Sequence, residues 1–217
     1  LLPPSEGKAE GGKAKSAWKP DSGSAGTQLA PLRRAVAGAY AKDSGVKVIG
    51  APTLPAHERY TGVVWKHLDL GSIASAQRRQ LVKRIFVVSG LLGLVRGDDP
   101  TPSYKLKMSA RLAPLGPLAK FWSPIITSEV AKLSHKNIVV DLLPNEHRAA
   151  IDWSQISNHV RVDLVAKSGG RVGGHDAKAA KGLLARHILT GRSDIKSLVA
   201  SFRHPVYKAV LAPPPAK

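Results

Sequence analysis

The sequence predicts an α/β fold in a single compact domain, with a mixed sheet flanked by helices; a mixed α+β arrangement is the alternative. Two short apolar runs, residues 85–89 and 137–143, are rich in β-branched side chains and have the length of buried strands. Segments with apolar residues at helical spacing, such as 29–41 and 117–133, alternate with them. Hydrophobic residues make up 43% of the 217 residues, which is enough for a sizeable core.

The first quarter of the chain is predicted to contain one helix and little other regular structure. Residues 9–27 are rich in Gly, Ser and Lys, and we expect them to form a mobile loop. The helix covers residues 29–41, with Arg33 and Arg34 on its outer face. Residues 45–59 are interrupted by glycine and proline, so an irregular path is predicted there.

The middle of the chain is predicted to run from a helix into the first buried strand. Ser72 has the character of an N-cap, and the helix that it opens would extend to Arg84. After the strand at 85–89, the glycines and prolines of residues 91–103 predict a loop. The alternation of residues 104–108 predicts a further strand.

The C-terminal half continues the alternation of strands and helices. The expected elements are a strand at 137–143, a short helix at 145–151, a strand at 160–166, a helix at 177–189 capped by Asp176, and a last helix beginning at Asp194. The proline-rich residues 211–217 are expected to form an extended tail. Because no internal repeat is present, we expect residues 1–217 to form a single domain.

The charge of the chain points to an anionic partner. The 33 Lys and Arg residues outnumber the 15 Asp and Glu residues, which leaves a formal charge of +18 and favours encounter with polyanions such as duplex DNA. The candidate DNA-binding residues lie on two predicted helices: Arg78, Arg79, Lys83 and Arg84 on one, and Lys178, Lys181 and Arg186 on the other. The alternative is a solvated basic surface without a specific partner.

Several classes of site are excluded or made improbable by composition. The chain has no cysteine, which excludes thiolate metal sites, and its eight histidines are scattered without ligand spacing. We therefore expect no metal site and no cofactor. No apolar run is long enough to cross a bilayer and the first residues lack the order of a signal peptide, so a cytoplasmic protein, monomeric and without membrane contact, is expected.

Polar side chains follow the predicted strands, and they define a second hypothesis. If the strands are parallel, their carboxyl ends meet at one crevice, the usual position of a ligand. The anion-binding candidates are Ser5, Lys8, Arg96 and Lys105; the catalytic candidates are Glu146 as proton acceptor, Tyr104 as donor, and Ser89. This hypothesis is an enzyme or a small-anion binder, and the residues leave open which of the two. In the structural alternative, Ser89 and Asn145 cap helices and Glu146 neutralises a nearby arginine.

A set of spaced motifs carries a resemblance to a known family. The matching residues are Tyr60-Thr61-Gly62, Ser89-Gly90-Leu91, Gly93, Arg96, Asp99, Tyr104, Leu106, Met108, Arg111-Leu112, Phe121-Trp122, Ile125-Ile126-Thr127, Asn145-Glu146, Lys181-Gly182 and Arg186. In this order and spacing the chain resembles the YaaA peroxide stress protein family over nearly its whole length. Ser5 and Lys8 match the opening segment of that family.

The resemblance implies a function in the cytoplasm. It implies a role in the hydrogen peroxide stress response by limiting damage from intracellular iron, a compact α/β domain with a basic cleft, and binding of double-stranded DNA. A helix-hairpin-helix element is associated with that binding, but residues 27–59 contain no clean hairpin of this type. We therefore expect DNA contact through general charge, tolerant of sequence. The resemblance implies no specific enzymatic reaction.

Overall fold

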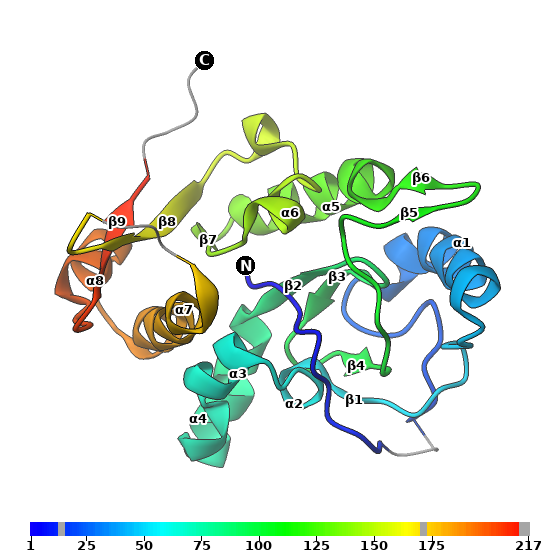
Figure 1. Cartoon of the computed structure of the whole chain (residues 1–217), viewed down its shortest axis with the longest axis horizontal. Helices are drawn as coiled ribbons and strands as arrows, with labels where there is room; N and C mark the ends of the chain where they lie inside the picture. The colour runs from blue at the N-terminus through cyan, green and yellow to red at the C-terminus, as the bar shows by residue number, and fades with distance from the viewer. Residues whose placement is uncertain (13–15, 170–172, 213–217) are drawn as a thin grey trace.

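The computed structural model describes residues 1–12, 16–169 and 173–212, and within them helices and short strands alternate (Figure 1). The largest sheet has three strands: β7 (Val139–Asp141), β8 (His159–Ala166) and β9 (Tyr207–Leu211). β7 pairs with β8 in parallel, and β8 pairs with β9 in antiparallel. The prediction of a single mixed α/β unit is confirmed. Two of the predicted strands are β7 and β8, whereas β9 was not predicted.

An antiparallel hairpin forms the second part of the core. β2 (Phe86–Ser89) pairs with β3 (Gly93–Arg96), so the prediction of a continuous loop over residues 91–103 is wrong. The hairpin turns sharply because Gly93 adopts a φ of 69°, a conformation that favours glycine, and the indole of Trp122 lies against it. Two further short pairs are antiparallel: β1 (Leu54–Pro55) pairs with β4 (Pro100–Thr101), and β5 (Arg111–Leu112) pairs with β6 (Gly116–Pro117).

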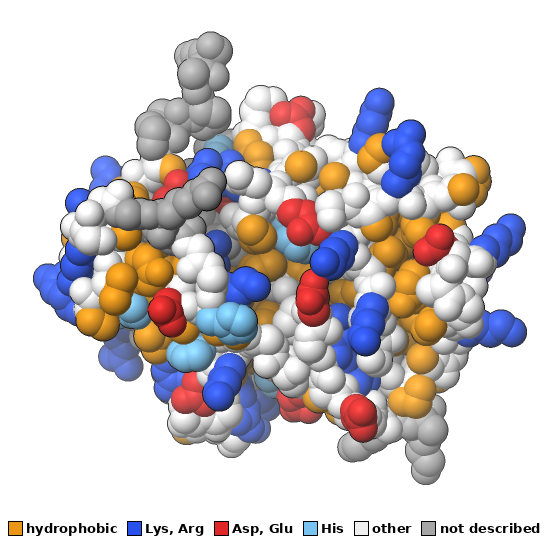
Figure 2. All heavy atoms as spheres, viewed as in Figure 1, with side chains coloured by type: hydrophobic (Ala, Val, Ile, Leu, Met, Phe, Trp, Pro, Cys, Tyr) orange, Lys and Arg blue, Asp and Glu red, His pale blue; other side chains and the backbone are white. Residues whose placement is uncertain are grey.

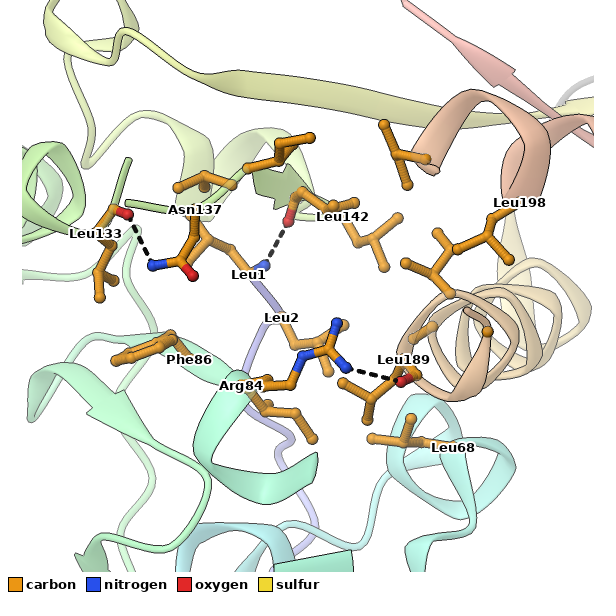
Figure 3. Close-up of a pocket in the computed structure, with 18 of the residues that line it drawn as sticks. Leu1, Leu2, Leu68, Arg84, Phe86, Leu133, Asn137, Leu142, Leu189 and Leu198 are labelled. Carbon is orange, nitrogen blue, oxygen red and sulfur yellow. Dashed lines mark hydrogen bonds between the residues drawn. The ribbon is translucent and has the colours of Figure 1, made fainter. Parts of the chain in front are cut away.

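Residues 1 and 2 connect the hairpin to the three-stranded sheet. The amide of Leu2 donates to the carbonyl of Phe86 at 2.9 Å, and the amide of Leu142 donates to the carbonyl of Leu1 at 3.2 Å. Figure 3 shows both leucines lying between Phe86 and Leu142. Because Leu2 also pairs in parallel with Val87, the combined strand arrangement is mixed, as the sequence predicts.

The described residues include eight α-helices: α1 (Gly26–Ser44), α2 (Ala56–Arg59), α3 (Val63–Leu68), α4 (Ser75–Leu81), α5 (Leu118–Ser134), α6 (Asn145–Arg148), α7 (Gly174–Thr190) and α8 (Ile195–Ser201). Short 3-10 turns cover Leu70–Ser72, Val82–Arg84 and Trp153–Gln155. The predicted helices are present, with two differences at their starts. α7 begins at Gly174, so Asp176 lies in its first turn and does not cap it as predicted. α4 begins after Ala74 rather than after Ser72, whose hydroxyl donates to the carbonyl of Asp69 instead. Asp194 caps α8 as predicted, accepting from the amide of Ser197.

Two further local predictions are wrong. Residues 104–108 are not a strand in the structure: Tyr104 and Met108 are buried as alternation predicts, but the backbone pairs with no strand among the described residues. Arg33 does not face outward: it is 1% exposed and donates to the carbonyls of Leu92 and Leu94 along β3, both at 2.9 Å. Burial is possible because the guanidinium meets carbonyl acceptors there.

The segment predicted as a mobile loop is anchored at Trp18. The Trp18 side chain is buried, its amide donates to the carbonyl of Ala51 at 2.8 Å, and its carbonyl accepts from Gly50 at 2.9 Å. At the other end of the chain, Leu211 belongs to β9 and the amide of Ala212 donates to Arg161, so the extended tail does not start at residue 211. Residues 213–217 of that predicted tail lie outside the described residues.

The most extensive contact between two helices of the described residues is that of α3 with α7, which lie side by side in Figure 1. A Cβ atom built on Gly182 would lie 2.7 Å from the Cβ of His67 and 3.0 Å from the amide nitrogen of Leu68. Only glycine allows the two backbones to approach this closely. None of the helices in the described parts of the chain is long and apolar enough to span a membrane.

Candidate functional site

A polar crevice of about 640 Å³ opens between the N-terminal segment, residues 104–107 and α6. Its polar lining comes from Ser5, Glu6, Lys8, Tyr104, Lys105, Lys107, Glu146 and His147. In Figure 1 the N-terminal segment crosses the middle of the view beside the chain that follows β4. The crevice thus brings together five of the residues that the sequence predicts for a ligand site, namely Ser5, Lys8, Tyr104, Lys105 and Glu146.

The N-terminal wall of the crevice is held by the chain around α3. The indole nitrogen of Trp65 donates to the carbonyl of Pro3 at 3.1 Å, and the amide of Thr61 donates to the hydroxyl of Ser5 at 3.1 Å. Gly62 is required beneath this wall, since a Cβ there would lie 2.6 Å from the Cβ of Ser5. These contacts fix the segment that positions Lys8.

Lys8 is a partly buried cation beside two tyrosine rings. Its ammonium donates to the carbonyl of Ser5 at 2.7 Å and lies 4.1 Å from the ring centroid of Tyr104 and 5.6 Å from that of Tyr60. Desolvation, with a contribution from the charge of Arg59, lowers the pKa of Lys8 to about 8. At neutral pH the side chain is therefore still mainly cationic, and cation–π contact with Tyr104 supports that charge.

Behind Lys8 lies a buried chain of three hydroxyl groups. The hydroxyl of Tyr104 is 2.6 Å from that of Ser89 and 2.8 Å from that of Tyr60. Burial raises the pKa of Tyr104 to about 12, so the phenol stays protonated and acts as part of a hydrogen-bond network. Ser89 also accepts from the amide of Leu92 at 3.1 Å, at the turn of the hairpin. Ser89 is thus placed behind the crevice wall and not in it.

The opposite wall is α6, which carries Glu146 and His147. One carboxylate oxygen of Glu146, Oε1, accepts from both the amide and the hydroxyl of Ser109, each at 3.0 Å. Although desolvation alone would raise the pKa of Glu146, the two bonds from Ser109 lower it, so the group is ionised at neutral pH. Burial lowers the pKa of His147, which favours a neutral imidazole.

Arg96 does not join the crevice, and this prediction is wrong. Arg96 pairs with Phe86 at the open end of the hairpin, whereas Ser89 pairs with Gly93 at the turn. The Arg96 guanidinium instead binds Asp98 with an N–O distance of 2.5 Å, which raises the pKa of Arg96. The error arises because the prediction placed the residues after 89 in a loop at a parallel sheet edge, whereas the chain reverses directly into an antiparallel strand.

The glycines after Ser89 make room for neighbouring segments of the chain and not for a ligand. A Cβ on Gly90 would lie 2.8 Å from the carbonyl oxygen of Lys107, and one on Gly97 would meet the Val82 backbone and lie 3.3 Å from the Cβ of Ile85. The carbonyl of Gly90 accepts from the indole of Trp122 at 2.8 Å. The glycine-rich motif therefore packs the hairpin against its neighbours.

The predicted DNA-binding residues separate into two groups. Lys181 donates to the carbonyl of Leu142 at 2.8 Å, and Arg186 donates to the carbonyl of Leu68 at 3.0 Å and to the hydroxyl of Ser72 at 2.8 Å. These two side chains fasten α7 to β7 and α3. Weaker bonds to backbone carbonyls are made by Arg84, to Leu189 at 3.3 Å, and by Arg78, to Gly71 at 3.2 Å.

The second group projects into solvent. Arg79, Lys83 and Lys178 are exposed, and no ion pair joins any of them to another of the residues that the structure describes. These three remain available to an external anion.

A second cavity of about 490 Å³ lies next to residues 1 and 2 (Figure 3). Leu2, Leu68, Phe86, Leu189 and Leu198 give it aliphatic and aromatic walls. Charged and polar side chains also line it, namely Lys83, Arg84, Asn137, Ser193 and Asp194. The crevice is the better candidate site because it brings together five of the residues that the sequence predicts for a ligand site. Among residues 1–12, 16–169 and 173–212, no group of three or more His, Asp or Glu side chains could hold a metal ion.

A comparison with known proteins identifies the family of the chain. The family model for peroxide stress protein YaaA matches residues 25–210. The chain belongs to the YaaA family. A UPF0246 protein of Streptomyces coelicolor is 30% identical over the whole of this chain and 93% of its own length.

Other UPF0246 proteins match part of the chain. A UPF0246 protein of Shewanella halifaxensis is 30% identical over 66% of this chain and 59% of its own length. One from Francisella philomiragia is 28% identical over 69% of this chain and 61% of its own length. The chain is thus similar to peroxide stress proteins, and its fold is the mixed α/β unit described above.

Some residues in or behind the crevice of this chain were not among the predicted site residues. Tyr60 completes the hydroxyl chain, Ser109 orients Glu146, and His147 closes the wall beside it. Tyr60 lies in one of the family motifs, so spacing alone could have indicated it. Ser109 and His147 carried no such signal, because their roles depend on contacts across 37 residues and on burial.

Proposed function

We propose that this YaaA-family protein acts in the cytoplasm as a monomer in the peroxide stress response, and that it binds duplex DNA without reading its sequence. The observation that carries the proposal is the formal charge of +18 together with basic side chains, such as Arg79, Lys83 and Lys178, that are exposed and unpaired in the described structure. Such side chains neutralise phosphates and release condensed counterions, which favours binding to any duplex.

The distribution of charge supports sequence-tolerant contact. Figure 2 shows Lys and Arg side chains spread around the rim of the viewed face as well as near its centre, where Asp and Glu lie among them. Dispersed side chains of this kind contact phosphates and do not form a ridge that enters a groove to read bases. Aromatic residues are 5% of the chain, so stacking on single strands is a weaker expectation.

Binding to a mixed-sequence duplex should weaken steeply as salt rises, with a double-logarithmic slope that scales with the number of phosphates contacted. Replacing Arg79 and Lys83 together by alanine should reduce the magnitude of this slope by about two, because each removes about one phosphate contact. Fluorescence anisotropy at several salt concentrations measures both quantities. Lys132→Ala, which removes a lysine paired with Glu129 at 2.6 Å, is the control. Binding that does not depend on salt, or absence of binding at low salt, would exclude duplex DNA as the partner.

We further propose that the protein limits damage by intracellular iron indirectly, by reducing the loose iron that reacts with peroxide near DNA. The absence of cysteine in the sequence supports an indirect effect. In cells that lack this protein, peroxide should increase both chelator-accessible iron, measured by electron paramagnetic resonance, and DNA strand breaks. A supplied copy should reverse both changes. An unchanged iron pool with restored survival would contradict the role in iron.

A further inference from the structure

We propose that the polar crevice is a binding site for a small phosphorylated molecule that carries hydroxyl groups, with the Lys8 ammonium holding the phosphate and Glu146 accepting from a hydroxyl. Arg79 and Lys83, which are proposed to contact DNA, do not line this site, whereas Lys178 acts on its edge through Glu6. Its features are a cation with unused donors, a fixed carboxylate, a cavity of ligand size and walls held by the fold.

The cation is the first of these features. Among the described residues only the carbonyl of Ser5 accepts a hydrogen bond from Lys8, at 2.7 Å, and an ammonium has three donors. Glu6, whose charge acts on Lys8, is bound to Lys107 at 3.0 Å. Lys8 is therefore partly desolvated without an ion-pair partner of its own, which is an unfavourable arrangement unless an anion completes it.

The surrounding charges favour a phosphate over a carboxylate. Lys105 and Lys107 line the same crevice, and the charge of Lys178 on α7 reaches Glu6 at its edge. Lysine ammonium groups act as point charges that suit the several oxygens of a tetrahedral dianion. A planar carboxylate is recognised best by the paired donors of a guanidinium, and among the described residues no arginine lines the crevice.

Glu146 supplies the second contact. Both bonds from Ser109 go to its Oε1 atom, and within the described part of the chain its Oε2 atom forms no hydrogen bond. Because the group is ionised, Oε2 can only accept, and a hydroxyl is a suitable donor. A second phosphate would be repelled there, so the ligand must be anionic at one end and carry hydroxyl groups at the other.

The size and rigidity of the crevice fit such a ligand. Its volume of about 640 Å³ lies in the range of small-molecule sites and exceeds the space that a single phosphate fills. Pro4, Leu106 and the ring of Tyr104 supply apolar surface for the body of the molecule. Since the contacts of Pro3 with Trp65 and of Ser5 with Thr61 hold the wall, little ordering is needed on binding.

Isothermal titration calorimetry with ribose 5-phosphate, inorganic phosphate and ribose tests the proposal. Ribose 5-phosphate should bind most tightly, phosphate more weakly, and ribose not measurably. Lys8→Met should weaken binding of both phosphate compounds about tenfold or more, the effect of losing a bond to a charged group. Glu146→Gln should weaken ribose 5-phosphate but leave inorganic phosphate unchanged. Lys132→Met, which replaces a lysine of α5 that does not line the crevice, should change neither.

The pH dependence distinguishes Lys8 from a surface lysine. With a pKa of about 8, Lys8 loses its charge between pH 7 and pH 9, so affinity for the phosphate ester should fall about tenfold over that interval. In Lys8→Arg the decline should disappear, because a guanidinium stays charged. Affinity that is constant to pH 9 in the wild type would overturn the assignment of Lys8.

Folding and DNA binding are measured with the same variants. The pKa of Lys8 is lower in the folded state than in the unfolded chain, so above pH 8 the unfolded chain binds more protons than the folded protein. At neutral pH the charge on Lys8 therefore opposes folding. The melting temperature of Lys8→Met should therefore be equal to or above that of the wild type, which excludes unfolding as the cause of lost binding. Phosphate binding equal in Lys8→Met and wild type would overturn the proposal. So would displacement of ribose 5-phosphate by duplex DNA, which would make the crevice part of the DNA surface.

Discussion

Gly182→Ala should destabilise the protein by about 3 kcal/mol, among the largest effects of any single substitution in this fold. The added Cβ would collide with the backbone of α3 at Val64 and Leu68 and with the Cβ of His67, none of which is the free end of a flexible side chain. Separating α3 from α7 would also lengthen the bonds from Arg186 to the carbonyl of Leu68 and the hydroxyl of Ser72. Urea denaturation followed by circular dichroism measures the change in the free energy of unfolding.

The matched control for this substitution is Gly38→Ala. Gly38 lies inside α1, and a Cβ there would meet no atom within 4 Å. Because alanine restricts the unfolded chain and favours the helix, this variant should be more stable by about 0.5–1 kcal/mol. Equal effects of the two substitutions would show that helix propensity, and not the close contact of α3 with α7, decides the outcome.

Arg33→Met should also destabilise the protein by about 3 kcal/mol, although methionine fills a similar volume in an apolar core. The guanidinium of Arg33 donates to the carbonyls of Leu92 and Leu94, both at 2.9 Å, and to that of Ser22 at 2.6 Å. Removing the guanidinium leaves buried carbonyl acceptors without donors. The substitution also removes the positive charge that attracts the buried carboxylate of Asp99.

Two further variants, Arg34→Met and Arg33→Lys, are the comparisons for Arg33→Met. Arg34 is exposed on the same helix, so Arg34→Met should change the free energy of unfolding by less than about 0.5 kcal/mol. Arg33→Lys should recover little stability, because one ammonium cannot reach acceptors that the planar guanidinium spans. Urea denaturation of the three variants side by side is the measurement. Full recovery with lysine would mean that charge alone, without the fork of donors, stabilises β3.

Local pattern was sufficient to predict much of the secondary structure. The helices α1, α5, α7 and α8 were predicted within a few residues, since each has apolar spacing or a capping residue that acts within one turn. The strands β2, β7 and β8 were predicted from runs of β-branched residues. The family was also indicated by short motifs whose spacing is a property of the sequence.

Partners far apart in the sequence could not be predicted. The hairpin of β2 and β3 was interpreted as a loop because Gly90 and Gly93 are residues typical of turns. Only the structure shows that glycine is needed at position 93 because the ring of Trp122 lies against it. The same error misplaced Arg96. Arg33 was assigned to the surface because charged residues are rarely buried, and the carbonyls that accept its bonds come from residues about 60 positions away.

The sequence by itself determined the residue types of the candidate site, and the tertiary structure decided which of them meet. Composition fixes the charge of +18, and the order of the motifs fixes the family. Whether a given cation is free depends on the acceptors that the fold brings to it: Lys181 and Arg186 are bound to backbone carbonyls, whereas Arg79 and Lys178 are exposed. Lys8 has unused donors in a cavity because burial and hydrogen bonding are set by packing, which no local pattern encodes.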